Sequence, residues 1–276
     1  MTYLWHMAKL TVKDLFALKG KRQMAQIYVR NPKEAAACEA AGIDMIVTSE
    51  RSSDVAGIRA AAPGTFLTIG LAYGEDYTST TDVLRGGFRA LKNGADAVYC
   101  GSSLGFVEAM ANEGIPVCGH VGMVPYKATW FGGFKAVGKT AEDALQVYQR
   151  TMDYQNAGAI AVEIEIVPHK VAAEISKRVN ILLIGMGSGA GCDAQYLFAT
   201  DVLGDNEGHV PRHAKVYRNL KAEYQRLHDE SIAAFREFKM DIDTGVYPAS
   251  NHMLEIKDEE FEKFMEQVEE SDDLLF

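Results

Sequence analysis

A histidine in the segment GIPVCGHVGMVPYK, residues 114–127, follows a short apolar run and has a glycine close on either side. Gly119 and Gly122 permit close approach of the backbone or of a ligand to His120. A neutral imidazole is able to donate or accept a hydrogen bond to a substrate there. The alternative is a histidine whose hydrogen bonds are satisfied at a strand end. Spacing alone leaves both interpretations open.

Two glutamates alternate with apolar residues in the segment AVEIEIVP, residues 161–168. In a strand, Glu163 and Glu165 point to one face and the apolar residues to the other. If the apolar face contacts helices, both carboxylates face the barrel interior. Burial there raises the pKa of a carboxyl group, which suits a proton-abstracting base. Alternatively, such a carboxylate binds a hard cation. The alternative is one glutamate paired with Lys or Arg and the other at the rim. We favour a functional role for Glu165, which is nearer the strand's C-terminal end.

A glycine-rich segment, IGMGSGAGCDAQ, covers residues 184–195. Its glycine spacing matches neither of the common nucleotide-binding motifs. It therefore favours a turn at which Gly187 and Ser188 let a substrate approach the backbone.

Short apolar runs that are typical of strands alternate with segments of helical spacing. The runs cover residues 23–29, 45–49, 66–72, 97–102, 117–122, 161–167, 181–187 and 196–204, and the helical segments cover residues 32–42, 80–94, 104–114, 140–158 and 168–179. Repeated strand and helix units predict parallel pairing, and eight units predict an α/β fold of the (β/α)₈ TIM-barrel type. Active sites of such barrels lie at the C-terminal strand ends. The other candidates there are Ser49, Glu50, Arg51, Gly70, Tyr73, Glu75, Tyr99 and Ser102.

The pattern changes after Pro211. Residues 213–240 predict a long helix that packs on the barrel or on a neighbouring subunit, and the acidic residues 255–276 form either a docked amphipathic helix or a solvated tail. We expect one domain over residues 1–276, with residues 212–276 as C-terminal helices and tail.

Composition limits the function classes. A hydrophobic content of 47% supports a full core, and a net charge of −10 argues against a nucleic-acid surface. The N-terminus has no secretory pattern and the chain has no long apolar run, so we expect a cytoplasmic protein without a membrane partner. The four cysteines have no disulfide or metal spacing and are expected to be reduced.

Seven segments in order carry a resemblance to one family. They are KLTVKDLFALKGKR, PVCGHVGMVPY, FGGFKAVGK, AGAIAVEIEIVP, IGMGSGAGCDAQ, DVLG and TGVYPASNH. Together they resemble ketopantoate hydroxymethyltransferase, of the phosphoenolpyruvate mutase and isocitrate lyase superfamily. The resemblance implies an oligomeric barrel enzyme that uses Mg²⁺, forms an enolate from a small 2-oxo acid and adds a one-carbon unit from methylenetetrahydrofolate. It places His120 beside the substrate and assigns Glu165 as the base.

Several positions depart from the family pattern. Glu50 falls where the family has a metal-binding aspartate, and Arg51 follows it. Gly70 and Gly101 stand where the family has acidic residues, and Tyr99 stands where it has a lysine. A magnesium site would then need Glu50 together with Glu163 or Glu75. Alternatively, Arg51 binds the substrate carboxylate and stabilises enolate charge without a metal. The expected catalytic set is Glu165, His120 and Tyr99, and the expected substrate contacts are Ser49, Arg51, Ser102, Gly187 and Ser188.

Three functions remain open on these grounds. The first is hydroxymethyl transfer, or a related aldol-type reaction, on a 2-oxo acid. The second is carbon–carbon cleavage or decarboxylation of an oxo acid on the same fold. The third is a binding subunit that has lost its metal site and its activity.

Overall fold

The computed structural model describes residues 9–74 and 76–273. The chain divides into two compact units, one ending at Asn219 and the other starting at Leu220. The division falls within the segment 212–276, which the sequence predicts to form C-terminal helices and a tail.

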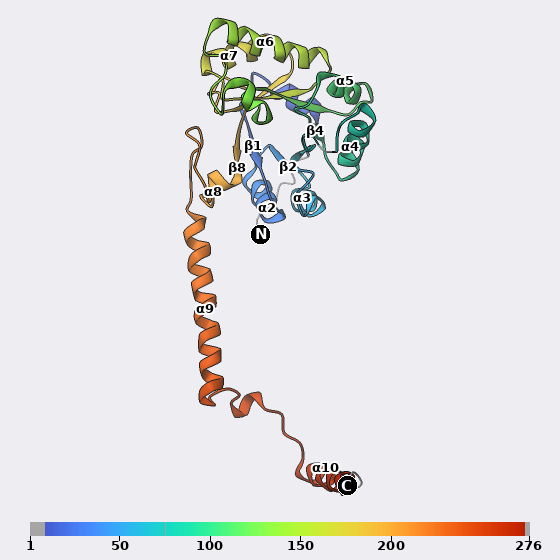
Figure 1. Cartoon of the computed structure of the whole chain (residues 1–276), viewed down its shortest axis with the longest axis vertical. Coiled ribbons are helices and arrows are strands. Elements are labelled where there is room, and N and C mark those ends of the chain that lie inside the picture. Colours follow the sequence, from blue (N-terminus) through green and yellow to red (C-terminus); the bar gives the residue numbers. More distant parts are fainter. Residues whose placement is uncertain (1–8, 75, 274–276) are drawn as a thin grey trace. The chain divides into compact units, whose positions relative to one another are not determined.

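Eight parallel strands form a closed barrel in sequence order, with the last strand paired to the first (Figure 1). This confirms the predicted (β/α)₈ TIM barrel. The strands are β1 (Met24–Tyr28), β2 (Met45–Ser49), β3 (Phe66–Gly70), β4 (Ala97–Tyr99), β5 (Val117–Gly122), β6 (Ala161–Glu165), β7 (Leu182–Met186) and β8 (Ala194–Phe198).

Helices lie between successive strands along the chain, except that β8 follows β7 without one. They are α1 (Val12–Leu18), α2 (Pro32–Ala41), α3 (Val55–Ala61), α4 (Thr80–Lys92), α5 (Leu104–Asn112), the 3₁₀ helix η1 (Pro125–Phe131), α6 (Ala141–Asn156), α7 (His169–Arg178) and α8 (Ala199–Leu203). Side chains cap several N-termini by accepting a backbone hydrogen bond: Ser79 does so for α4, Ser103 for α5 and Thr140 for α6.

The eighth strand was predicted at residues 196–204, and its second half is wrong. The strand ends at Phe198, and residues 199–203 form α8. The apolar residues Val202 and Leu203 suit a short helix as well as a strand. Gly204 then ends α8 in the left-handed conformation, at φ +69°.

The strand side chains divide between two buried clusters. One contains residues such as Met45, Phe66 and Ile184 and fills the barrel, while the other contains residues such as Ile46 and Val162 and packs against the helices. Because successive side chains point to opposite faces, the outward position of Val162 directs its neighbour Glu163 inward.

A glycine lets α6 pack closely behind β5. A Cβ at Gly119 would lie 2.4 Å from the ring of Tyr154, which is fully buried on α6. The glycine before His120 is therefore a packing requirement of the barrel wall, and not a ligand contact.

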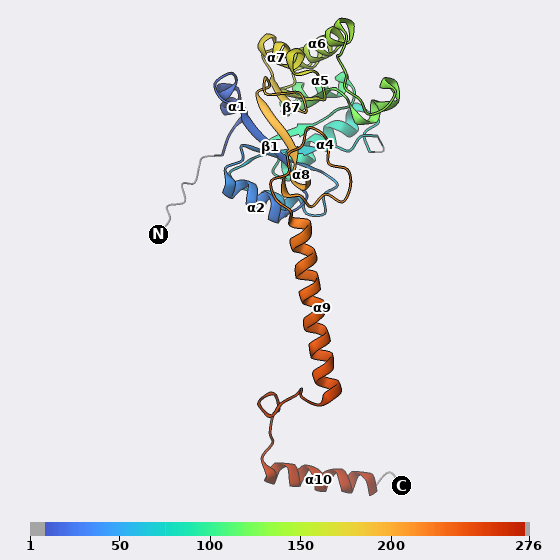
Figure 2. The ribbon, with the colours of Figure 1, turned by 90° about the vertical axis from the view of Figure 1, so that its left-hand side faces the viewer.

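The second unit contains α9 (Leu220–Thr244), the 3₁₀ helix η2 (Ser250–His252) and α10 (Asp258–Asp273), as Figure 2 shows. The long helix predicted at residues 213–240 is present but begins and ends later. No residue of α9 is buried. None of the helices in the described part of the chain has the length and apolar character that crossing a bilayer requires.

Candidate active site

A cavity of about 440 Å³ lies at the C-terminal end of the barrel strands. Six residues that the sequence analysis selected line it together: Ser49, Tyr99, Ser102, His120, Glu163 and Glu165. They come from the ends of β2, β4, β5 and β6, and from the segment after β4. The structure thus brings the imidazole and both glutamates to one mouth of the barrel.

A tyrosine, a histidine and a glutamate form a continuous polar chain in this cavity. The Tyr99 hydroxyl lies 2.5 Å from His120 Nδ1, and His120 Nε2 lies 3.1 Å from Glu165 Oε2. Burial, with the nearby Glu163 carboxyl, raises the pKa of Tyr99 well above its usual value, so the hydroxyl keeps its proton. Tyr99 then donates to Nδ1, and the imidazole proton sits on Nε2.

The Nε2 atom of His120 is buried and makes no hydrogen bond with any described residue. Its contact with Glu165 has the distance of an ion pair but not the alignment of a hydrogen bond. Buried polar atoms are normally hydrogen-bonded, so an unpaired one beside a cavity points to a ligand. An oxygen atom of a bound substrate is a suitable acceptor for this N–H.

The two glutamates have different environments. Burial, and then the charge of Glu165, raise the pKa of Glu163 to about 8. Gln26 Nε2 donates a hydrogen bond to Glu163 Oε1 at 3.3 Å. Glu163 is therefore mostly a neutral acid at pH 7, whereas Glu165 contacts His120.

The backbone is strained directly after Glu165. Ile166 has φ +50°, which is unusual for a β-branched residue. The neighbouring strand stabilises this conformation, since the Ile166 N–H donates to the Met186 carbonyl oxygen at 2.8 Å. Backbone strain of this kind is concentrated at functional sites. Here the strained residue directly follows Glu165, the last residue of β6 and the one that contacts His120.

Aromatic residues form much of the cavity wall, and of these the sequence analysis selected Tyr73 and Tyr99. Tyr28 and Phe198 have ring centroids 4.9 Å apart, and Tyr73 stacks on Tyr126 at 3.6 Å. For Tyr28, the available signal was its position near the end of the first apolar run. Phe198 lies near the start of the run predicted at residues 196–204, so that run gave no such signal.

The predicted metal ligand Glu50 lies outside this cavity. Its carboxylate accepts hydrogen bonds from the Ala72 N–H at 2.6 Å and the Tyr77 hydroxyl at 2.5 Å, and pairs with Arg89 at 3.1 Å. The physical reason is alternation: Ser49 points into the barrel, so the next residue points away. This placement argues against a metal site that combines Glu50 with Glu163.

Arg51 also lies away from the catalytic cavity. It lines a separate cavity of about 270 Å³ together with Glu50, and its guanidinium lies 3.7 Å from the Asp76 carboxylate. The placement does not support the predicted contact of Arg51 with a substrate carboxylate in the barrel.

The donor set does not fit a magnesium ion. In residues 9–74 and 76–273, no three His, Cys, Asp or Glu side chains are grouped so as to hold a metal. Gly70 and Gly101 contribute no side-chain oxygen to the cavity, and Glu75, the other acid predicted to join Glu50, lies outside the described residues. Magnesium requires near-octahedral oxygen coordination, which these residues do not supply.

Gly187 and Ser188 do not line the cavity, contrary to their predicted role as substrate contacts. The Ser188 hydroxyl is fully buried, donates to the Ile164 carbonyl oxygen at 2.8 Å and accepts from the Val167 N–H at 3.1 Å. A Cβ at Gly187 would lie 2.9 Å from the His213 ring. Ser188 therefore links the segment after β7 to the end of β6, and Gly187 allows the His213 ring to pack closely against that segment.

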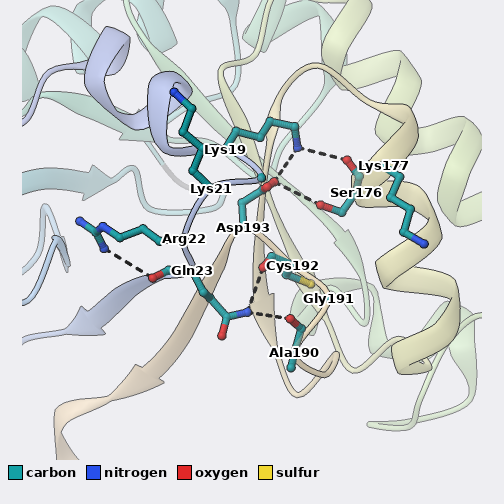
Figure 3. Close-up of a pocket in the computed structure, with 11 residues that line it drawn as sticks. Lys19, Lys21, Arg22, Gln23, Ser176, Lys177, Ala190, Gly191, Cys192 and Asp193 are labelled. Carbon is teal, nitrogen blue, oxygen red and sulfur yellow. Dashed lines mark hydrogen bonds and ion pairs between the residues drawn. The ribbon is translucent and has the colours of Figure 1, made fainter.

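Figure 3 shows a cavity of about 510 Å³ at the opposite, N-terminal end of the strands. Lys19 reaches the buried Asp193 carboxylate at 2.7 Å, and Gln23 donates to the carbonyl oxygens of Ala190 and Cys192. Arg22 pairs with Asp44 in the same region. Because these polar groups are satisfied by each other, we assign this cavity to the stability of the barrel base and not to catalysis.

The fold and the site define a (β/α)₈ barrel enzyme with a buried acid and histidine pair. The sequence pattern of the family described as ketopantoate hydroxymethyltransferase matches residues 48–250, and the chain belongs to this family. It is 31% identical to 3-methyl-2-oxobutanoate hydroxymethyltransferase 1 of Methylibium petroleiphilum, over 91% of this chain and 90% of that protein. It is 28% identical to 3-methyl-2-oxobutanoate hydroxymethyltransferase of Nitrosopumilus maritimus, over 94% and 98%.

Solved structures show the same fold at low sequence identity. The carboxyl transferase domain of Rhizobium etli pyruvate carboxylase matches with a TM-score of 0.53 at 12% identity, over 70% of this chain and 43% of that one. A putative lyase/mutase from Burkholderia cenocepacia matches with a TM-score of 0.50 at 12% identity, over 68% and 80%.

The buried acid Glu163 predicts a dependence of stability on pH. Because its folded pKa, about 8, exceeds the ordinary value of 4.5, the folded state retains a proton that the unfolded state loses, and stability falls as pH rises through this interval. Glu163→Gln removes this dependence. Between pH 5 and 8, the free energy of unfolding of the wild type should fall relative to the variant by up to about 1.4 kcal/mol per pH unit.

Urea unfolding of both proteins at several pH values measures this difference. Glu108→Gln, at an exposed position on α5, is the control and should follow the wild type. Parallel curves for the wild type and Glu163→Gln would contradict a raised pKa for Glu163.

Proposed function

We propose that this protein transfers a hydroxymethyl group to a small 2-oxo acid. The observation that carries the proposal is the convergence of His120 and Glu165 in one cavity at the C-terminal end of the barrel. The relatives are named for hydroxymethyl transfer to 3-methyl-2-oxobutanoate. We take that oxo acid as the first substrate to test.

Glu165 is the base in the proposed reaction. Its carboxylate removes a proton from the carbon next to the ketone, and negative charge develops on the ketone oxygen as the enolate forms. The unpaired Nε2–H of His120 faces the cavity and stabilises this oxygen, while Tyr99 holds the imidazole in the required tautomer. The neutral Glu163 acid is a second donor at the same site.

The enolate carbon then forms a bond to a one-carbon unit, for which methylenetetrahydrofolate is the proposed donor. Water supplies the hydroxyl group of the product, and tetrahydrofolate leaves. Ser49 and Ser102 line the cavity and are proposed to donate hydrogen bonds to the substrate carboxylate.

We propose that enolate formation in this chain does not depend on a resident magnesium ion. The support is the poor fit of the donor set, since Glu163 and Glu165 are the only two carboxyl groups among the described residues that line the cavity. Hydrogen bonds from His120, whose imidazole Tyr99 holds in place, and from the Glu163 acid provide an alternative means of stabilising the enolate.

Replacing the base tests the reaction at its first step. With 3-methyl-2-oxobutanoate in D₂O and no one-carbon donor, proton NMR measures exchange of the hydrogen next to the ketone. Glu165→Gln keeps the shape of the side chain but not its basicity, so exchange should fall by about 100-fold or more. Glu108→Gln is the control and should exchange at the wild-type rate.

Full exchange in Glu165→Gln would remove this residue from the role of base. Consumption of the oxo acid by the wild type in the absence of any one-carbon donor would favour the alternative carbon–carbon lyase or decarboxylase.

Metal removal tests the second part of the proposal. After dialysis against EDTA, the exchange rate should stay within about twofold of the untreated enzyme, and added Mg²⁺ should not raise it, because no enolate-stabilising group in the proposed site is a metal ion. Metal analysis of the purified protein accompanies the assay. One tightly bound Mg²⁺ per chain, with activity lost on removal and restored on addition, would contradict metal independence.

We also propose that the protein is a homo-oligomer. Along α9, the residues Tyr224, Leu227, Phe235, Phe238 and Ile242 follow the three- and four-residue spacing of one helix face, and each is about half exposed or more. Helices in water depend mostly on packing of an apolar face. A second copy of the chain is the proposed source of that packing.

Light scattering during size exclusion measures the assembly. Leu227→Glu combined with Phe235→Glu should reduce the mass to that of a monomer, because two charges enter the apolar face. Gln225→Glu combined with Arg236→Glu adds charge on another face of α9 and should leave the mass unchanged. A monomeric wild-type protein would contradict the proposal.

A further inference from the structure

A second cavity adjoins the catalytic one and has a strongly positive lining. Its volume is about 470 Å³, and it shares Tyr73, Ser102 and Tyr126 with the catalytic cavity. Lys127 of η1 and Arg150 of α6 both line it. No carboxylate of a described residue is part of its lining.

The two cations have no acidic partner among the described residues that line this cavity. Among the described residues, no carboxylate forms an ion pair with Lys127, whose amine lies 5.6 Å from the Tyr126 ring centroid. In the part of the chain that the structure describes, Arg150 forms one ion pair, with Asp153 at 4.0 Å on the same helix, and its guanidinium lies 5.2 Å from the Tyr154 ring centroid. Asp143 lines a neighbouring cavity together with both cations. Burial, and then the charge of Arg150, lower the pKa of Lys127, which is the direction expected for two like charges that face each other.

Other groups around the cavity also favour negative charge. Helix α5 begins here, with Ser103 as its N-cap and cavity lining, and a helix N-terminus attracts anions. The Ser102 hydroxyl lies at the boundary with the catalytic cavity. The Tyr126 hydroxyl is buried and has no hydrogen-bond partner among the described residues.

The catalytic cavity itself contains no lysine or arginine among its described lining residues. An anionic group that extends from a ligand in the catalytic cavity into the adjoining one meets Lys127 and Arg150 there. The stacked rings of Tyr73 and Tyr126, 3.6 Å apart, form the shared wall and provide an apolar path between the two cavities.

We propose that Lys127 and Arg150 form a subsite for a carboxylate that is remote from the reacting carbon. The inference rests on the proposed function, because it assumes that the same ligand extends to Glu165 and His120. Two sources carry such a group: the glutamate part of a folate-type one-carbon donor, and the distal carboxylate of a 2-oxo dicarboxylic acid. An arginine with a lysine suits either source, since charge-assisted hydrogen bonds to carboxylates are strong.

The test titrates the full chain with two ligands by calorimetry. 4-Aminobenzoyl-L-glutamate represents the donor, and 2-oxoglutarate represents a dicarboxylic substrate. Lys127→Met and Arg150→Met should each weaken binding of the correct ligand by about tenfold or more. Lys127→Arg keeps the charge and should retain most of the affinity.

Lys139→Met is the matched control. This lysine is exposed, lies in the same connection between β5 and α6, and does not line the cavity, so its removal should leave binding unchanged. Thermal unfolding confirms that each variant is folded. The affinity of the wild type for the ligand should also fall as the salt concentration increases. The affinity of Lys127→Met and Arg150→Met should fall less, because each has lost one of the two charges.

The ligand that depends on the two cations identifies the source. Equal affinity in the wild type, Lys127→Met and Arg150→Met, or no binding of either ligand, would overturn the proposal. Charge-dependent binding without hydroxymethyl transfer would retain the subsite and reject the proposed reaction. Transfer with unchanged KM values for both substrates in the variants would retain the reaction and reject the subsite.

Discussion

The pairing of β5 with β6 is the constraint on which the site depends. Register places His120 beside Glu163 and Gly122 beside Glu165, so the imidazole and both carboxyl groups reach the same mouth of the barrel. The pairing requires glycine at position 122, where φ is +85° and a Cβ would lie 2.3 Å from the Glu165 carbonyl oxygen. A shift by one residue would direct the glutamates toward the helices.

This arrangement separates the roles of two neighbouring acids. Burial keeps a proton on Glu163, while Glu165 faces the imidazole, so one carboxyl group is able to donate a hydrogen bond and the other to accept a proton. Tyr99 completes the chain by fixing the imidazole tautomer. Gly70 and Gly101 line the same cavity without a side-chain oxygen, so Glu163 and Glu165 are the acidic side chains among its described lining residues.

Periodicity in the sequence predicts the barrel well because buried parallel strands are short apolar runs bounded by helices. It predicts the inward direction of Glu163 and Glu165 for the same reason. It does not predict that Glu50 is held by the Ala72 N–H and the Tyr77 hydroxyl, nor that Ser188 is buried by hydrogen bonds to Ile164 and Val167. The helices α1 and α3, of seven residues each, are too short for a helical period to identify. The cations of the adjoining cavity come from two elements that only the tertiary fold brings together.

A crystal structure of the full chain with a bound, unreactive analogue of 3-methyl-2-oxobutanoate tests the central claim most directly. The account predicts that the carbon next to the carbonyl lies about 3–3.5 Å from the Glu165 carboxylate, with the carbonyl oxygen facing His120 Nε2. A ligand bound through a metal ion, or bound away from these two side chains, would contradict it.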